Sequence, residues 1–259
     1  MEKNSPWRNS PLSPSNWPAE SFGLSETLLV ALGAIGITLL TIFLSGIALR
    51  AGGTLQMAPG GGLKAIAMGP LLFLQLVFYI AVGVYLYFTV PRIARRSWQE
   101  LGLRAPTWRD AGTGLIGACV MLIVVYMASL VVERVSHHEQ EQVVVQMFRS
   151  LRDPRLLVLF GVFATVFAPI VEETVFRAFV FNAFLRRTGV LTAATLSGVL
   201  FGAAHFELFA LFPLACGGVV LALTYYRTGC LWSSIIAHAC FNSVELIGVL
   251  ATNTSHVTK

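Results

Sequence analysis

Charged residues are scarce in this chain. Asp, Glu, Lys and Arg make up 12% of its 259 residues, whereas hydrophobic residues make up 56%. Soluble globular domains carry about 25% charged residues, so a chain with half that share cannot cover a water-facing surface of its size. The composition excludes a soluble enzyme, and it excludes intrinsic disorder for the bulk of the chain. It predicts an all-α fold, a polytopic bundle of transmembrane helices.

Cysteine is scarce as well. The four cysteines have no CxxC spacing, and all of them lie in or beside apolar runs. They are interpreted as small buried hydrophobic residues, so neither a disulfide-stapled secreted module nor a cysteine zinc site is expected. The formal net charge of +5 comes from cations between the apolar runs, where membrane proteins usually keep them. Nucleic acid is therefore not an expected partner, whereas the lipid bilayer is.

Seven apolar segments approach or reach the length that crosses a bilayer, which is about 20 residues. We expect seven spans, or eight if the region before residue 71 holds a re-entrant piece. The second span is expected to end at Pro91. The connections between the later segments are very short, so neighbouring helices there must be antiparallel. The segments are 28–49, 71–90, 111–132, 156–187, 190–206, 208–226 and 230–250.

Composition divides the chain into four parts. Residues 1–23 are rich in proline and are predicted to be a disordered tail, with no signal-peptide pattern. Residues 24–155 are predicted to be accessory transmembrane helices with loops and an amphipathic segment near residues 143–151. Residues 156–250 form the core, and residues 251–259 form a C-terminal tail. We expect an integral, multi-pass protein of a bacterial inner membrane.

Ionisable residues inside the apolar segments are concentrated late in the chain. Each costs about 2.5–3.5 kcal/mol to insert, so such residues persist when they pair or when they have a function. The first three segments contain none, which predicts that these spans serve packing and that the site lies between the later helices. Apart from Arg186 and Arg187 at the end of the fourth segment, these residues are Glu172, Glu173, Arg177, His205, His238 and Glu245.

The first two of these residues, Glu172 and Glu173, are adjacent in the sequence. On a helix, Glu173 and Arg177 lie four residues apart on one face and can form an ion pair, which either supports a site or only fixes helix packing. Glu172 lies about 100° around the helix from Glu173. Its carboxylate is therefore expected to face a different group and to be the reactive one.

The other polar groups come from two later segments. Phe201 and His205 share one helix face, while His238 shares a stripe with Asn242 and Glu245 on the last segment. At 1.5 Å per residue, the two histidines, Asn242 and the first glutamate fall into a common layer roughly 12–22 Å from one membrane side. Residues that only pack helices together need not lie at one depth. The common layer therefore predicts that these residues form one site.

A glutamate with two histidines suggests two chemistries. In the first, Glu172 takes a proton from a water molecule that His205 holds, and His238 and Asn242 stabilise the oxyanion of a tetrahedral intermediate. In the second, Glu172, His205 and His238 hold a zinc ion. The chain has no HExxH motif and no histidine four residues after either histidine. The scheme without a metal or other cofactor is therefore favoured.

Three short motifs thus follow one another on successive apolar segments: E-E-x-x-x-R at 172–177, F-x-x-x-H at 201–205 and H-x-x-x-N at 238–242. Together they resemble the three motifs of the CPBP family of intramembrane proteases. This family joins the type II CAAX prenyl endopeptidases with bacterial relatives linked to bacteriocin processing and self-immunity. The resemblance covers about residues 156–250. It implies an all-helical membrane fold and an endopeptidase acting on a membrane-associated protein or peptide.

The resemblance also implies a role for each residue at the motif positions. Glu172 would activate the water with His205 as its partner, and His238 and Asn242 would stabilise the oxyanion. Glu245 lies outside the family pattern and is expected either to orient His238 or Asn242 or to pack. The supporting residues are Glu173, Arg177, Phe201 and Glu245.

Two other classes of function stay open. A non-enzymatic member of the same fold, acting in bacteriocin self-immunity or as a scaffold, would keep the motifs for helix packing. A transporter or channel would use Glu172 and Glu245 as proton or cation sites, but it would be expected to show paired half-helices or an inverted repeat. Neither is evident, and the intact set of four motif residues favours the endopeptidase.

Overall fold

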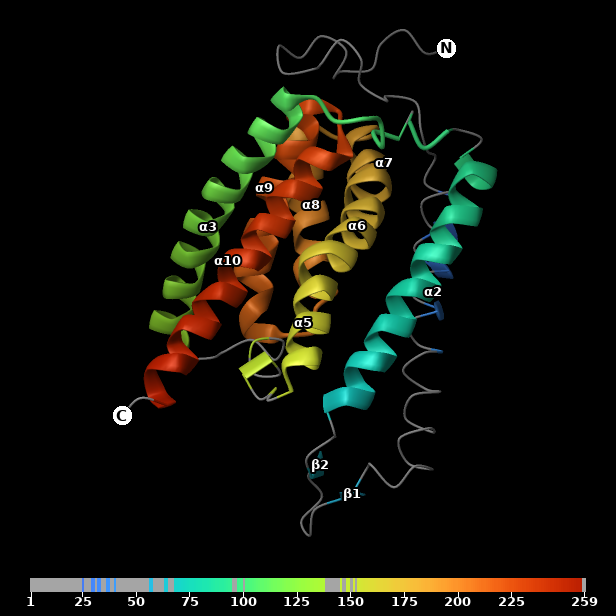
Figure 1. Cartoon of the computed structure of the whole chain (residues 1–259). Coiled ribbons are helices and arrows are strands. Elements are labelled where there is room, and N and C mark those ends of the chain that lie inside the picture. The colour runs from blue at the N-terminus through green and yellow to red at the C-terminus, as the bar shows by residue number, and fades with distance from the viewer. Residues whose placement is uncertain are drawn as a thin grey trace, which may run out of the picture.

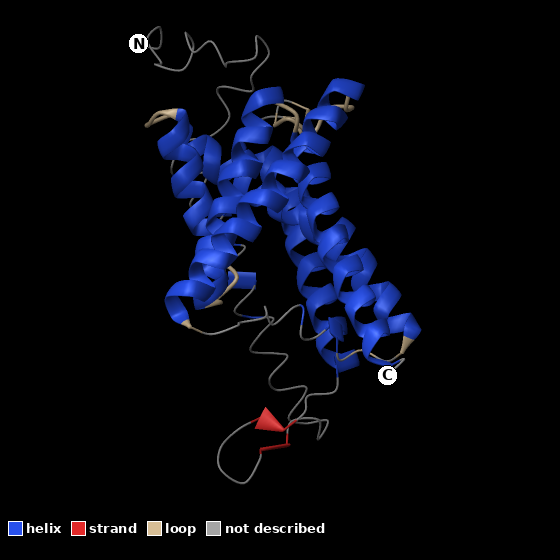
Figure 2. Ribbon diagram, turned by 90° about the vertical axis from the view of Figure 1, so that its left-hand side faces the viewer, coloured by secondary structure: helices blue, strands red, loops and turns tan. Residues whose placement is uncertain are grey.

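The computed structural model describes residues 68–94, 97–99, 101–137, 151 and 153–257, with scattered residues between 25 and 64 and between 145 and 149. The expected tail 1–23 and most of the first span lie outside these residues. The described part is mainly helical, and the short strands β1 (Gln56–Met57) and β2 (Leu63–Lys64) pair antiparallel away from the bundle (Figures 1 and 2).

The helices follow the expected apolar segments in order. The expected fourth span is a continuous run of five short elements, of which η1 and η2 are π-helical. The helices are α2 (Met68–Ala94), α3 (Trp108–Ser136), α5 (Pro154–Val162), η1 (Phe163–Phe167), α6 (Ala168–Glu173), η2 (Thr174–Phe181), α7 (Asn182–Leu185), α8 (Val190–Ala203), α9 (Leu208–Thr228) and α10 (Leu231–Val257).

Four of the described helices are long and apolar enough to cross a membrane: Trp108–Ser136, Pro154–Leu185, Leu208–Thr228 and Leu231–Thr252. Two shorter apolar helices, Phe73–Thr89 and Val190–Ala203, lie among them. The predicted all-helical integral membrane fold is confirmed. The count of seven to eight spans stays a prediction, because the first span lies mostly outside the described residues.

Side-chain caps explain where several helices begin and end. Thr107 and Asp110 form a reciprocal capping box at the start of α3. Asp153 accepts from the backbone at the start of α5, where Pro154 occupies the first turn. The αL conformation of Gly229, with φ 62°, ends α9. These local signals fix the ends of helices whose lengths the apolar runs dictate.

The predicted end of the second span at Pro91 is wrong. Helix α2 continues through Pro91 to Ala94. Pro91 lies in the last turn, so its missing N–H removes one bond, to the carbonyl of Tyr87, and the helix has almost no further turns to lose. At the other end of the chain, α10 runs to Val257, beyond the expected end of the last span at residue 250.

The run from α5 to α7 passes Pro169 without a break. The N–H of Ala168 bonds to the carbonyl of Phe163, five residues back, which is the π-helical pattern of η1. The wider turn lets Pro169 begin α6 although it has no N–H to donate. The N–H of Ala168 is bonded to the carbonyl of Phe163, and Pro169 has no N–H. The carbonyl of Ala164 therefore accepts no hydrogen bond from its own helix.

Helices α8 and α9 pack at backbone distance through glycine. A Cβ on Gly202 would lie 2.5 Å from the carbonyl oxygen of Leu211, and a Cβ on Gly198 would lie 2.5 Å from that of Ala215. Small residues allow such approach between membrane helices.

In Figure 1, α3 and α2 flank the described bundle on opposite sides, and α2 lies against α5 and α6.

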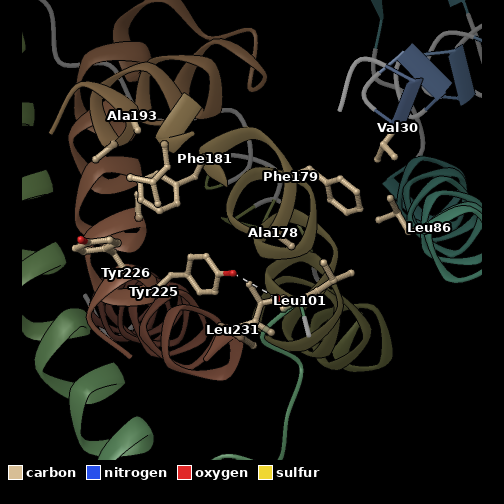
Figure 3. Packing of buried hydrophobic residues seen from close by; sticks show 14 of the residues in the cluster. Val30, Leu86, Leu101, Ala178, Phe179, Phe181, Ala193, Tyr225, Tyr226 and Leu231 are labelled. Carbon is tan, nitrogen blue, oxygen red and sulfur yellow. Dashed lines mark hydrogen bonds between the residues drawn. The ribbon is translucent and has the colours of Figure 1, made fainter. Parts of the chain in front are cut away.

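The connection between α2 and α3 covers the bundle end where α9 meets α10. Leu101 is fully buried there, and its carbonyl accepts a hydrogen bond from the Tyr225 hydroxyl at 3.3 Å (Figure 3). The backbone N–H of Leu231 donates to the carbonyl of Gly102 at 2.8 Å. Gly102 has φ +92°, which favours glycine. This end of the bundle is filled by side chains such as Phe181.

The predicted amphipathic segment near residues 143–151 lies mostly outside the described residues. Phe148 and Leu151, which the structure does describe, are buried against Phe160 of α5 and Val249 of α10. The apolar positions of this segment therefore contact the helical bundle.

Candidate active site

The two glutamates of the first motif lie on α6, between the π-helical elements η1 and η2. Both face His238, from opposite ring nitrogens, but their other partners differ: Arg177 for Glu173 and Tyr79 for Glu172. Glu173 is fully buried and points into the bundle, while the Glu172 side chain keeps 16% of its surface exposed. π-Helical turns occur often at functional sites, and here they flank the acidic pair on both sides.

Glu173 pairs with Arg177, which confirms the predicted i, i+4 contact. Arg177 Nε lies 2.9 Å from Glu173 Oε2, and both side chains are completely buried. The pair is held by charge, because the N–H is not aligned with this oxygen well enough for a hydrogen bond. The guanidinium also donates to the carbonyl of Gly218 at 3.3 Å and lies 4.7 Å from the centre of the Phe201 ring. A buried charge is thus compensated by an anion, a carbonyl and an aromatic face.

The other oxygen of Glu173 fixes His238. His238 Nδ1 lies 2.9 Å from Glu173 Oε1, and His238 is 4% exposed. An ionised carboxylate only accepts hydrogen bonds, so the Nδ1 atom carries the hydrogen. Nε2 is therefore the nitrogen that His238 presents to the rest of the site, as an acceptor when the ring is neutral and as a donor when it is protonated.

Glu172 faces that nitrogen. Its Oε2 atom lies 3.9 Å from His238 Nε2, while its Oε1 atom accepts a hydrogen bond of 2.5 Å from the hydroxyl of Tyr79 on α2. The separation of 3.9 Å is too long for a direct hydrogen bond. A water molecule can bridge a gap of this size, with one O–H donated to the carboxylate and its other contact made to Nε2.

His205 follows the end of α8, in the turn that leads to α9. Its Nδ1 atom lies 2.8 Å from the carbonyl of Phe201, which leaves Nε2 as the available nitrogen. The Phe201 ring lies 4.9 Å from the His205 ring and 5.7 Å from the His238 ring, edge to face in both cases. Phe201 thus brings the two histidines together. Within the described residues, no hydrogen bond or ion pair joins His205 to Glu172.

Asn242 lies one turn after His238 on α10. Its Nδ2 atom donates to the carbonyl of Ala164 at 2.7 Å, which is the carbonyl that η1 and Pro169 leave without a helical donor. The amide has a second N–H that can bind elsewhere. The side chain therefore ties α10 to the π-helical turn in front of the glutamates.

Glu245 does not take part in this arrangement. It is exposed on α10, and in the described part of the chain it makes no hydrogen bond or ion pair with His238 or Asn242. Its position gives no support to the orienting role that was one of its two expected roles.

Tyr79 is the residue that the sequence did not reveal. The expectation that the early spans serve only packing is wrong for α2, because its Tyr79 contacts the central carboxylate. The expectation counted ionisable residues, and a tyrosine in an apolar run carries no such signal. Tyr79 belongs to no sequence motif. Its contact with Glu172 depends on how α2 packs against α6, and the sequence alone does not show that packing.

The alternative to the metal-free scheme is a zinc ion held by Glu172, His205 and His238. In the described residues, no three histidine, cysteine, aspartate or glutamate side chains gather closely enough to hold a metal ion. Glu172 and His238 approach each other. His205 instead has its Nδ1 atom bound to the carbonyl of Phe201, and the described contact between the two histidines is through the Phe201 ring, which packs against both. The expected ligand set of Glu172, His205 and His238 therefore does not fit a zinc site in this arrangement.

Comparisons with known proteins agree with the motifs. Residues 154–244 match the family model described as type II CAAX prenyl endopeptidase Rce1-like. YdiL of Bacillus subtilis (strain 168), named as a candidate membrane peptidase, is 33% identical over 84 residues, or 32% of this chain and 34% of YdiL, so the match spans about a third of that relative. The membrane-embedded CAAX protease MroQ of Staphylococcus aureus (strain USA300) is 25% identical over 183 residues, which cover 68% of this chain and 73% of MroQ.

No solved structure gives a significant match to the chain. The family segment contains the acidic pair, both histidines and Asn242, and it leaves out Tyr79. Residues 154–244 thus match an Rce1-like CAAX protease domain, which agrees with the resemblance that the three motifs carry.

Proposed function

We propose that this protein is an intramembrane endopeptidase that hydrolyses a peptide bond of a membrane-associated protein or peptide, in the manner of CAAX processing. The family assignment supports the class of reaction. One observation carries the residue-level proposal: the Glu172 carboxylate faces Nε2 of His238 at 3.9 Å, while Glu173 holds the opposite side of the same imidazole. Helix packing alone does not require two carboxylates on opposite nitrogens of one histidine.

Glu172 is the general base of the proposed reaction. It takes a proton from water as the water oxygen attacks the carbonyl carbon of the scissile bond. The Oε2 atom is the oxygen available for this transfer, because Oε1 is bound by Tyr79. His205, with Nε2 available at the end of α8, helps to hold the water. When the intermediate collapses, the proton on Glu172 passes to the departing amine nitrogen, and the base is restored.

His238 and Asn242 stabilise the oxyanion of the tetrahedral intermediate. A protonated His238 donates from Nε2, and the neighbouring Glu173 carboxylate stabilises the positive charge on the ring. Asn242 donates through the N–H that does not bind Ala164. Arg177 holds Glu173 in place, and Phe201 packs against both histidines.

The proposed site needs no metal ion, and the protein is proposed to act in a bacterial inner membrane. The apolar helices support membrane integration. A substrate with a C-terminal CAAX sequence is the first class to test, since MroQ is named as a CAAX protease.

The test is cleavage by purified protein in proteoliposomes. The substrates are a fluorogenic peptide ending in a CAAX sequence, in farnesylated and unmodified forms, and a library of membrane peptides. Wild type and Glu172→Gln are compared with and without EDTA, and products are identified by mass spectrometry. Cleavage by wild type that survives EDTA and disappears in Glu172→Gln supports the proposal. Cleavage lost on chelation would revive the zinc scheme, and equal cleavage by both proteins would reject Glu172 as the base.

A further inference from the structure

Tyr79 binds the central carboxylate from outside the family segment. Its hydroxyl donates to Glu172 Oε1 at 2.5 Å, and α2 precedes residues 154–244. A separation of 2.5–2.7 Å is typical of an O–H donor on an ionised carboxylate. We propose that Tyr79 is a positioning residue of the active site, which holds Glu172 so that Oε1 is occupied and Oε2 is presented toward His238. This inference rests on the proposed function, in which Glu172 activates water.

The ring of Tyr79 is itself fixed by aromatic contacts. It packs edge to face against Phe163 with ring centres 4.6 Å apart, and against Phe78 with centres 5.1 Å apart. Phe163 begins η1, on the same continuous helical run as Glu172. Tyr79 therefore contacts this run at two points, one aromatic and one through the hydroxyl, so the hydroxyl has a defined direction.

The approach of α2 to α6 is close enough to make the hydrogen bond depend on helix packing. Gly83 lies one turn after Tyr79, and a Cβ placed on it would lie 3.9 Å from Cγ2 of Val171, the residue before Glu172. This is an ordinary van der Waals distance, so alanine fits at Gly83. A longer side chain meets Val171 and moves α2 away from α6.

The two oxygens of Glu172 thus have separate partners. A carboxylate that is bound at one oxygen loses the freedom to rotate away from the reacting position, which is the kind of pre-organisation that catalysis requires. In the described residues, the titratable groups that face Glu172 are Tyr79 from α2 and His238 from α10. The Glu173–Arg177 pair lies behind His238 on the same helical run as Glu172.

The first experiment compares wild type, Tyr79→Phe and Tyr87→Phe in proteoliposomes with the fluorogenic peptide. Tyr87 is on the same helix but 62% exposed, which makes it a matched control. Tyr79→Phe is expected to lower kcat by about 10-fold to 100-fold with KM and thermal midpoint nearly unchanged. Tyr87→Phe is expected to match wild type. A Tyr79→Phe variant with the kcat of wild type, or one whose kcat falls only together with its thermal midpoint, would overturn the inference.

The second experiment needs no cleavage and separates this inference from the proposed function. Dicyclohexylcarbodiimide reacts with carboxyl groups, and its adduct on Glu172 can be quantified by peptide mapping as a labelling curve against time at one fixed pH. In Tyr79→Phe, Glu172 is expected to be labelled faster than in wild type, because no hydroxyl occupies its Oε1 atom. Identical labelling curves would overturn the role of Tyr79 even if wild type cleaves. A faster labelling curve in a protein without peptidase activity would reject the proposed function and leave the contact intact.

A pair of substitutions at Gly83 tests the same contact without changing Tyr79. Gly83→Ala is expected to keep the wild-type labelling curve, and Gly83→Leu is expected to shift it as Tyr79→Phe does. Thermal midpoints of both variants show whether each one folds. If folded Gly83→Leu keeps the wild-type curve, the position of α2 does not control Glu172.

Discussion

His238 Nδ1 lies 2.9 Å from Glu173, and the same carboxylate lies 2.9 Å from Arg177. This buried chain of contacts ties α10 to the helical run that carries the acidic pair. Because Glu173 binds the Nδ1 side, the Nε2 side of His238 is turned toward Glu172. Glu173 therefore orients His238, whose Nε2 atom faces Glu172.

Glu173→Gln is expected to cost mainly stability. The change leaves Arg177 without its anion in a fully buried position, and breaking a buried ion pair costs about 3 kcal/mol or more. A thermal melt in detergent measures the effect. Glu133→Gln, on the exposed surface of α3, is the control and is expected to melt like wild type. Equal midpoints for Glu173→Gln and Glu133→Gln would show that the pair contributes nothing to folding.

Asn242→Ala is expected to affect both stability and turnover. Loss of the hydrogen bond to Ala164 leaves a carbonyl of η1 unsatisfied, at a cost of about 1–3 kcal/mol. Loss of an oxyanion donor lowers kcat by about 10²–10³-fold. Melting curves and kcat measured on the same preparation separate the two effects. A variant that is destabilised but turns over normally would confine Asn242 to a structural role.

Gly202→Ala is expected to destabilise the contact between α8 and α9. The added methyl group would lie 2.5 Å from the Leu211 carbonyl oxygen, and forced overpacking costs about 1–3 kcal/mol. Because Phe201 precedes this position on α8 and His205 lies in the turn that follows the helix, cleavage should also fall. Gly161→Ala on α5 has no atom within 4 Å of its added carbon and should be tolerated. If both variants melt together with wild type, the helices are not in backbone contact.

Asp110→Asn is expected to weaken the start of α3 without changing catalysis. Asp110 completes the capping box with Thr107 and accepts two hydrogen bonds from Arg104, which raise the pKa of that guanidinium. The change keeps the Thr107 cap and removes a carboxylate from the first turn of the helix, which costs about 0.3–1 kcal/mol. Arg104 is 40% exposed, so its ion pair is screened by solvent and adds little. A lower melting midpoint with unchanged kcat is the expected result, and a large loss of kcat would contradict it.

Most of the fold was predictable because apolar length and helix periodicity are local properties. The segments from residue 71 onward became helices, with end points set by caps and turns. The Glu173–Arg177 pair was also predictable, because four residues on a helix define that contact. Even the separate direction of Glu172 follows from helix geometry.

The remaining contacts depend on how helices lie against one another. Tyr79 approaches Glu172 only because α2 packs on α6, and no spacing along the chain encodes that. Asn242 binds Ala164 because η1 and Pro169 free a carbonyl, and no motif spacing marks that carbonyl in the sequence. The expected partnership of His205 and Glu172 stays a prediction, since Phe201 lies against His205 and no direct contact forms in the described part of the chain.

The central claim is that Glu172, among the intramembrane carboxylates, activates the water. Its most direct test is the single-turnover cleavage rate of wild type, Glu172→Gln and Glu245→Gln in proteoliposomes, each with a verified thermal midpoint. Both changes remove one charge from the core segment, but Glu245 is exposed and apart from His238. The account predicts that Glu172→Gln lowers the rate by about 10²–10⁴-fold, while Glu245→Gln stays close to wild type. A folded Glu172→Gln that cleaves at the wild-type rate would contradict it.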